Sequence, residues 1–549
     1  MSQIEVVLQN TGERIKVPQG TMLADIAPSS QYPFLGALVN NRVERLSYRI
    51  YNPKTIFFFD ITHRQGWRTY QNTLCFMLYK AVKDVYPQAR LRVEYTLLKG
   101  FFCSIKFADN DNVEPAETVC QTVKSRMKEL VRLDIPFETR TMLRTDAIEL
   151  LREQDMPETV ALLEGLDQLY IDIQYLDGTP HKTGGILAPA TGCILGWDLK
   201  PFGDGYLLDC YKDTPEPFIS RPKLFSIFEE HHKWVDLLHV PTITSLNKIV
   251  KDGGSNHLIH VSEALHEKKY ASIADAIYQR RNTVKMVLLA GPSSSGKTTS
   301  CRRLGVQLSV LGFDVRQISL DDYFVPRSRT PKLPNGEYDF EDVTAIDKPL
   351  LNEHLTKLFQ GEAVEIPTFD FLTGNPYFSG KKLQLSPNSI LIVEGIHALN
   401  PILTSQIADE LKFKIYVSAI TQIAIDDQNV IHSSDNRMIR RIVRDNNFRG
   451  WDAYNTLHRW EDVQAGEVKH IYPYQENADV MFNSALLYEL GVLRTYAEPQ
   501  LKRVPENCQE FAEANRLLNF LQLIEPIDAK HIPPTSIMRE FLGGSSFDY

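Results

Sequence analysis

The chain has 549 residues, of which 43% are hydrophobic and 23% are charged, and its formal net charge at pH 7 is -9. This length exceeds what one hydrophobic core supports, so several domains are expected, and the acidic balance argues against a nucleic-acid coat or a membrane-surface binder. The seven cysteines are scattered without a CxxC pair and no apolar run approaches bilayer length, so we expect a cytoplasmic protein with reduced thiols and no membrane partner.

The first half of the chain is expected to hold two small domains. In residues 1–62, apolar and polar positions alternate in IEVVLQ and again in RIKVP, on either side of a turn, which predicts a hairpin in a β-rich domain. Residues 63–235 mix strand and helix patterns as an α+β domain does. The Pro-rich stretch from about 200 to 240 is expected to be irregular.

The second half has a different pattern. Residues 236–280 are predicted to form a helical connector. Apolar strands then alternate with amphipathic helices over residues 281–500, which is typical of an α/β domain with a parallel sheet and flanking helices. Residues 501–549 are expected to form a helical tail.

The strongest motif is GPSSSGKT, which fits G-x-x-x-x-G-K-[ST] and lies between an apolar strand pattern and a helix pattern. In this arrangement backbone N–H groups wrap phosphates at a helix N-terminus, a lysine reaches the β- and γ-phosphates, and a hydroxyl binds Mg²⁺. The sequence therefore predicts an ATP and Mg²⁺ site, with Lys297 and Thr298 in the last two roles. The expected nucleotide-binding residues are Gly291, Pro292, Ser293, Ser294, Ser295, Gly296, Lys297, Thr298 and Thr299.

Three further segments favour a kinase over a switch or motor ATPase. Asp321 and Asp322 follow the next strand, where a carboxylate can accept the proton of an attacking hydroxyl. Glu394 ends a later apolar strand and suits a Mg²⁺ partner. An arginine-rich segment follows, which contains Arg437, Arg440, Arg441, Arg444 and Arg449. Arg437, Arg441 and Arg444 fall on one helical face, where they can clamp phosphates and stabilise the transferring group.

In this order and spacing, these segments resemble the uridine kinase and phosphoribulokinase family of P-loop kinases. The resemblance implies that Asp321 is the catalytic base, with Asp322 as the fallback, and that Lys297, Arg444 and Arg449 assist catalysis. It also implies a substrate site formed by Asp322, Tyr323, Asp339, Phe369, Phe371, Arg441 and Arg444, with Thr298 and Glu394 on the metal. The chain departs from the family near Gly374, where uridine kinases usually carry a histidine that reads the pyrimidine.

The N-terminal half carries two other resemblances. Residues 1–62 resemble a TGS domain, and AVKDVYPQARLRVEYTLLKGFFCSI with DGTPHKTGG resembles the editing module of threonyl-tRNA synthetases. The two histidine-containing pairs of that module fall on Asn72 with Phe76 and on Asp177 with His181. Because one imidazole cannot hold a tetrahedral zinc ion, we interpret this half as a retained fold that has lost its editing chemistry.

We therefore expect an ATP-dependent kinase that transfers the γ-phosphate to a hydroxyl of a small molecule, with a nucleoside of the uridine or cytidine type as the leading acceptor. Two alternatives stay open. One is a P-loop kinase for a non-nucleoside sugar or another small metabolite. The other is an RNA-associated regulator whose synthetase-like half binds tRNA while the kinase half acts as a nucleotide-dependent switch. Self-association is a further expectation, since related kinases often form homo-oligomers.

Overall fold

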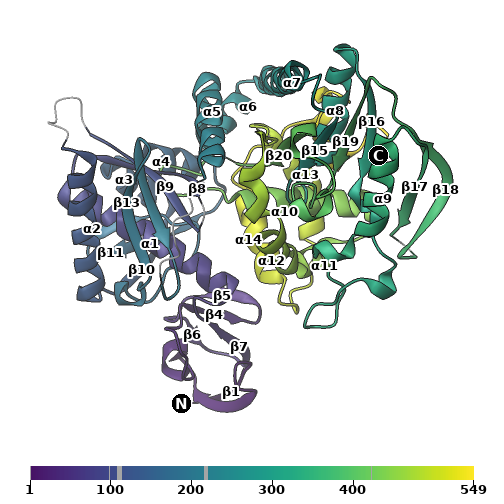
Figure 1. The fold of residues 1–549 in the computed structure, drawn as a ribbon. Helices are drawn as coiled ribbons and strands as arrows, with labels where there is room; N and C mark the ends of the chain where they lie inside the picture. Colours follow the sequence, from purple (N-terminus) through teal and green to yellow (C-terminus); the bar gives the residue numbers. More distant parts are fainter. Residues whose placement is uncertain are drawn as a thin grey trace.

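The computed structural model describes residues 2–97, 99–107, 114–214, 221–371, 373–421 and 423–548. Figure 1 shows a small sheet at the N-terminus, an α+β part beside it, and a larger α/β part that contains the C-terminus. Three helices, α5 to α7, run between the last two parts.

The N-terminal sheet has the strand order β2-β1-β7-β4-β5. The predicted hairpin is confirmed, because β1 and β2 pair antiparallel with Val6 opposite Ile15. Strand β7 pairs parallel to β1 and antiparallel to β4, and the buried side chains of Val6, Leu8 and Ile56 fill the core beneath. The strands are β1 (Gln3–Leu8), β2 (Glu13–Pro18), β4 (Gly36–Val39), β5 (Arg42–Glu44) and β7 (Lys54–Phe59), with a second small pair β3 (Thr21–Met22) and β6 (Arg49–Ile50).

The second part packs the long helix α1 (Arg64–Val85) and α2 (Ala116–Leu133) on an antiparallel sheet of order β13-β14-β9-β8. A smaller antiparallel sheet of order β10-β11-β12 lies with α3 and α4. The remaining elements are β8 (Arg90–Leu97), β9 (Gly100–Lys106), β10 (Phe137–Leu143), α3 (Arg144–Glu153), α4 (Pro157–Glu164), β11 (Tyr170–Leu176), β12 (Thr179–His181), β13 (Trp197–Phe202) and β14 (Gly205–Cys210).

The expectation of an irregular stretch between residues 200 and 240 is wrong. Strand β14 extends the sheet through its pairing with β9, and α5 (Pro222–Leu238) starts on a proline, which suits the first turn of a helix because its missing N–H would be unpaired there. Helices α6 (Ile243–Lys251) and α7 (Ser255–Gln279) follow.

The C-terminal part is built on a five-stranded sheet of order β16-β19-β15-β20-β21, in which every described pair is parallel. This confirms the predicted parallel sheet. Apolar strands with both faces covered suit such a sheet, and every residue of β15 and β19 is buried. The strands are β15 (Met286–Ala290), β16 (Asp314–Ser319), β19 (Ser389–Glu394), β20 (Lys412–Ser418) and β21 (Val480–Asn483).

Helices and a hairpin surround this sheet. Strands β17 (Val364–Asp370) and β18 (Asn375–Leu383) form an antiparallel hairpin at its side. The helices are α8 (Lys297–Val310), α9 (Lys348–Phe359), α10 (Ser433–Arg444), α11 (Ala453–His458), α12 (Trp460–His470) and α13 (Glu489–Leu501). A π-helical turn over Asp445–Arg449 extends α10, a distortion that is frequent at functional sites.

The tail contains α14 (Phe511–Leu521) and α15 (Arg539–Leu542). Ile537, Met538 and Phe541 are fully buried in the core of the C-terminal part, so the tail is an integral element of it.

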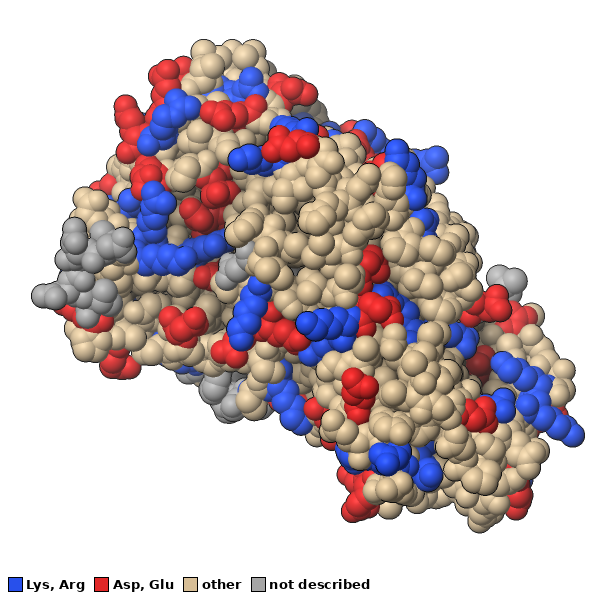
Figure 2. Space-filling model, turned by 90° about the horizontal axis from the view of Figure 1, so that it is seen from above, with Lys and Arg blue, Asp and Glu red and all other residues tan. Residues whose placement is uncertain are grey.

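The surface of the molecule is mixed in charge. On the face shown in Figure 2, lysine and arginine side chains are interspersed with aspartate and glutamate, and no continuous basic surface is seen. Among the described residues, no helix is both long and apolar enough to cross a bilayer.

Candidate functional site

The phosphate-loop motif lies where the sequence predicts it, in the turn between β15 and α8. Gly296 has a φ of 79° and Ser294 a φ of 58°, both in the left-handed region, which turn the chain into the helix. A Cβ atom on Gly291 would collide with the carbonyl oxygen of Val417, so the loop requires glycine there for close packing against β20. The loop therefore leads directly into the first turn of α8, whose N–H groups have no partner within the helix.

Two backbone donors of this region hold carboxylates. The Ser293 N–H donates to Oε1 of Glu467 at 3.1 Å. The Thr299 N–H donates to Oε2 of Glu540 at 3.1 Å, and the Thr299 hydroxyl donates to the same oxygen at 2.8 Å. These are donors of the kind that such a loop offers to phosphate oxygens, and here they hold carboxylate oxygens of the chain itself.

Lys297, Asp321 and Glu394 form one electrostatic group beside the loop. Burial lowers the pKa of Lys297, while Glu394 and Asp321 act against that shift. Burial and the charge of Asp321 raise the pKa of Glu394 to about 7, although Lys297 opposes the rise and the Ser319 hydroxyl donates to Glu394 at 2.9 Å. The structure thus brings these three predicted residues together, and Thr298 lies with Lys297 in the first turn of α8.

The two adjacent aspartates differ in their surroundings. Asp322 accepts a hydrogen bond from the Phe369 N–H, and burial raises its pKa. Asp321 instead interacts with the charges of Lys297 and Glu394. The next residue, Tyr323, is not brought to the site: its side chain is fully buried and its hydroxyl hydrogen bonds with Nδ1 of His354 at 2.9 Å.

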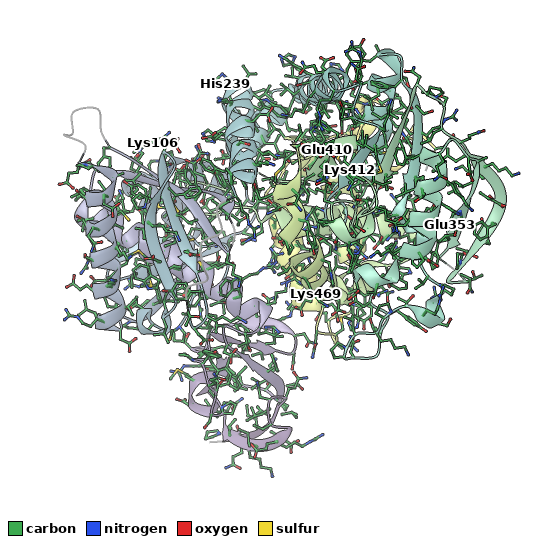
Figure 3. The ribbon with its side chains drawn as sticks, in the orientation of Figure 1. Lys106, His239, Glu353, Glu410, Lys412 and Lys469 are labelled. Carbon is green, nitrogen blue, oxygen red and sulfur yellow. The ribbon has the colours of Figure 1, made fainter. Side chains whose placement is uncertain are left out.

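The turn that contains Asp339 also contains a candidate site residue that the sequence did not reveal, Glu341. Oδ1 of Asp339 accepts the N–H groups of Glu341 and Asp342 at 3.0 and 3.1 Å, so this oxygen stabilises the turn. Glu341 is the buried carboxylate of the turn: burial raises its pKa to about 7, with Arg441 acting against the rise. The sequence signal was available, since Glu341 stands two positions after Asp339. Asp342 faces the end of α12, where Nζ of Lys469 lies 3.5 Å from its Oδ2 (Figure 3).

The aromatic residues expected to wall the substrate pocket lie side by side. Phe369 is 5% exposed and Phe371 is 56% exposed, and their ring centroids are 5.1 Å apart. Both rings also contact Phe324. Phe371 is therefore an exposed aromatic surface supported by a buried one.

Gly374, where the family usually has histidine, has a φ of 71° and takes a different neighbour. A Cβ atom there would lie 2.5 Å from Nε of Arg327, and Nη2 of Arg327 donates to the carbonyl of Phe371 at 2.8 Å. An arginine side chain thus occupies the space beside Gly374.

The arginine-rich helix α10 covers the phosphate loop, and its arginines separate into two groups. Arg437 forms a buried ion pair with Glu467, with Nη2 to Oε2 at 2.7 Å, and Arg440 forms one with Glu489. Both also donate to carbonyl groups of the loop. These two side chains are already paired with carboxylates in the core.

The other three arginines, Arg441, Arg444 and Arg449, share Asp445 as a carboxylate partner. Nη1 of Arg441 donates to the Ser293 hydroxyl at 2.9 Å. Arg444 is half-buried with Nη1 4.0 Å from Oε1 of Glu540, and desolvation together with repulsion by Arg449 lowers the pKa of Arg444 to about 10. Arg449 is partly exposed and pairs with Asp445 at 3.4 Å. Glu540 and Glu467 are the further site residues that the sequence did not reveal.

Comparisons with known proteins relate the C-terminal part of the chain to a family of kinases. Residues 286–487 match the family model described as Phosphoribulokinase / Uridine kinase family. A uridine kinase from Staphylococcus haemolyticus is 30% identical over 194 residues, which cover 35% of this chain and 84% of that protein. A uridine kinase from Saccharomyces cerevisiae is 28% identical over 208 residues, 37% of each chain. A solved D-glycerate 3-kinase from Cryptococcus neoformans is 14% identical and covers 38% of this chain and 89% of its own, with a TM-score of 0.29.

Proposed function

Since this chain belongs to the phosphoribulokinase and uridine kinase family through residues 286–487, we propose that it transfers the γ-phosphate of ATP to a hydroxyl of a nucleoside of the uridine or cytidine type. One observation supports this proposal most strongly. Two backbone N–H groups of the phosphate-loop region donate hydrogen bonds to carboxylates, and the charged side chains of Lys297, Asp321 and Glu394 interact beside the loop. That combination supplies both a phosphate site and an acid–base group.

In the proposed reaction, Asp321 accepts the proton of the attacking hydroxyl while the oxygen–phosphorus bond forms and the bond to ADP breaks. Lys297 and the loop N–H groups neutralise charge on the phosphates. Arg441 and Arg444 approach the transferring group from α10. The Thr298 hydroxyl and Glu394 are the residues of this chain that would hold Mg²⁺, which would offset negative charge on the phosphates.

ATP must displace both carboxylates to reach the loop. Ser293, Ser294 and Ser295 are buried under α10, and Glu540 holds the first turn of α8. We therefore propose that α10 and α15 move apart from the loop when ATP binds and close again over the phosphates, which excludes water from the transfer.

The test is a coupled ADP-release assay with ATP and Mg²⁺, run over a panel of nucleosides and sugars with the wild type and Lys297→Ala. ADP release that depends on uridine or cytidine and is lost in Lys297→Ala would support the proposal. ATP binding by the wild type without turnover on any nucleoside would reject the nucleoside as acceptor.

A non-nucleoside sugar or another small metabolite is the second candidate, and Gly374 is the observation that favours it. The space next to this glycine is taken by Arg327 and not by an imidazole. A guanidinium group recognises carboxylate or phosphate oxygens better than a pyrimidine edge, so an acidic acceptor would suit it. Consumption of such a sugar in the same panel, with nucleosides inert, would select this candidate.

A further inference from the structure

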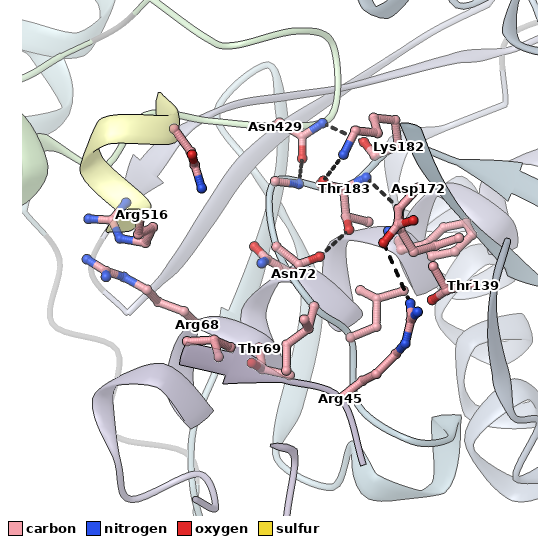
Figure 4. A pocket seen from close by; sticks show the side chains of 18 of the residues that line it. Arg45, Arg68, Thr69, Asn72, Thr139, Asp172, Lys182, Thr183, Asn429 and Arg516 are labelled. Carbon is pink, nitrogen blue, oxygen red and sulfur yellow. Dashed lines mark hydrogen bonds and ion pairs between the residues drawn. The ribbon is translucent and has the colours of Figure 1, made fainter. Parts of the chain in front are cut away.

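A cavity of about 1010 Å³ lies away from the phosphate loop, where the N-terminal half meets the C-terminal part. Its walls come from the N-terminal sheet, from α1, from the segment around β12, from residues 425–435 and from α14. Figure 4 shows Arg68 and Arg516 on one side of this cavity, and Lys182, Thr183 and Asn429 on the other. The volume suits a ligand of nucleotide size.

One wall presents an ammonium group that lacks a partner of opposite charge. Nζ of Lys182 donates to the carbonyl of Thr183 at 3.3 Å, and among the described residues it forms no ion pair with a carboxylate. Burial lowers the pKa of Lys182, with Asp172 and Asp426 opposing from a greater distance. A cation withdrawn from water in this way is stabilised by any anion that enters the cavity.

The neighbouring histidine offers an unused hydrogen-bonding group. His181 is 2% exposed and lines the cavity, and neither ring nitrogen has a hydrogen-bond partner among the described residues. Its ring centroid lies 4.8 Å from that of Phe76 and 5.1 Å from that of Tyr79, and burial lowers its pKa to about 3, so it is neutral. A neutral imidazole supplies one donor and one acceptor, which suits a hydroxyl group.

The opposite wall carries an excess of positive charge. Nη2 of Arg68 lies 2.9 Å from Oδ1 of Asp435, and Arg516 pairs with both oxygens of Asp435 at 2.8 Å. The same buried cluster includes Arg64 and Glu513, so three guanidinium groups share two carboxylates. Arginine forks bind oxyanions with two parallel hydrogen bonds, and this cluster has a positive charge to offer.

We infer that this cavity is a binding site for a small organic oxyanion of about nucleotide size, a phosphate monoester or a carboxylate that also carries hydroxyl groups. Its oxyanion binds Lys182 or the Arg68 and Arg516 pair, and its hydroxyl groups hydrogen bond with His181. This inference is independent of the reaction proposed for the phosphate loop.

The same site connects to the kinase part. Asp435 lies in the first turn of α10, so an oxyanion that draws Arg68 and Arg516 toward itself weakens their hold on the helix that covers the phosphate loop. Because only a ligand with different affinities for two states can shift them, occupancy of the cavity is expected to change the KM for ATP.

The test measures binding calorimetrically on the full-length chain carrying Lys297→Ala, which weakens nucleotide binding at the phosphate loop without touching the cavity. The probes are uridine 5′-monophosphate, ribose 5-phosphate, inorganic phosphate and citrate, which separate phosphate esters from carboxylates. Lys182→Ala and His181→Ala are compared with Lys128→Ala, an exposed lysine on α2 outside the cavity.

We expect at least one organic probe to bind, with affinity about ten-fold weaker in Lys182→Ala or His181→Ala and unchanged in Lys128→Ala. Lys182→Ala removes an unpaired cation, so it is expected to fold, and thermal unfolding checks this. Equal binding by all variants would overturn the inference, as would the absence of binding by every probe.

Discussion

The carboxylate of Glu540 occupies a donor pair on the phosphate loop, the N–H and hydroxyl of Thr299. A negative charge at this position competes with phosphate oxygens for the same donors. Replacing Glu540 with glutamine keeps the shape of the side chain and removes its charge. We expect Glu540→Gln to bind ATP about three- to ten-fold more tightly, measured by calorimetry, because charge-assisted hydrogen bonds are the stronger ones.

Asp528→Asn is the matched control for that substitution, since Asp528 is an exposed carboxylate on the same tail and pairs only with Lys530 among the described residues. It should leave the affinity for ATP unchanged. Weaker ATP binding by Glu540→Gln would mean that this carboxylate supports the loop instead of competing with the nucleotide.

The raised pKa of Glu394 predicts a pH dependence of stability. Because this pKa is about 7 in the folded chain and ordinarily 4.5, the folded state retains a proton between those values that the unfolded chain has released. Protonation of Glu394 therefore stabilises the ligand-free protein fully below pH about 4.5, and this contribution is lost as the pH rises through 7.

The measurement is urea unfolding of the wild type and Glu394→Gln from pH 5 to 8, without ATP and Mg²⁺. The stability of the wild type relative to the variant should fall by up to about 3 kcal/mol and then level off above pH 7. The buried histidines change the unfolding free energy with pH in the opposite direction. Because both proteins contain them, their contribution cancels when the unfolding free energy of Glu394→Gln is subtracted from that of the wild type. A constant difference across this range would show that the pKa of Glu394 is not raised.

At the scale of the element, α10 combines two kinds of arginine. Arg440 pairs with Glu489 in the core, so Arg440→Met leaves a buried carboxylate uncompensated and should cost about 3–5 kcal/mol in unfolding free energy. Arg444 contributes little to stability, because burial and Arg449 already lower its pKa to about 10. Arg444→Ala should instead lower kcat by about 10²-fold or more.

Urea unfolding and steady-state kinetics on both variants separate these two roles. The double variant Arg440→Met with Glu489→Leu should recover most of the lost stability, since both charges are removed together. A large loss of stability in Arg444→Ala, with kcat preserved, would contradict the division within α10.

The elements that the sequence predicts well are those with strong local signals. The strand, glycine turn and helix around Lys297 follow from periodicity and the motif, and the β1–β2 hairpin follows from alternation. The region from 200 to 240 was missed because prolines dominate its local pattern, whereas α5 uses Pro222 at its start. Glu540 was missed because its contact with Thr299 joins residues 241 positions apart, which no local pattern reveals.

At the scale of the whole molecule, the N-terminal half docks on segments that flank α10. The Val93 N–H donates to the carbonyl of Asp427 at 2.8 Å, which joins β8 to the chain just before α10. Arg64 pairs with Glu513 at 2.8 Å and joins α1 to α14. These contacts between the two halves could not be predicted from the sequence. Changes in composition along the chain indicate where a domain ends, but they do not indicate which surfaces of two domains pack together.

These contacts predict that the two halves unfold together. Differential scanning calorimetry should show one cooperative transition for the full chain, shifted upward by ATP and Mg²⁺ as a whole. Two resolved transitions, of which ATP moves only one, would mean that the contacts between the halves contribute little to stability.

Identification of the reaction product tests directly whether the chain transfers a phosphoryl group to a small-molecule hydroxyl with Asp321 as the base. The full-length wild type and Asp321→Asn are incubated with ATP, Mg²⁺ and uridine or cytidine, the product is identified by mass spectrometry, and ATP affinity is measured alongside. We expect a nucleoside monophosphate from the wild type, a loss of about 10²–10⁴-fold in kcat for Asp321→Asn, and nearly unchanged ATP affinity. Full turnover by Asp321→Asn would contradict the assignment of the base, and ATP binding without any phosphorylated nucleoside from the wild type would contradict the proposed reaction.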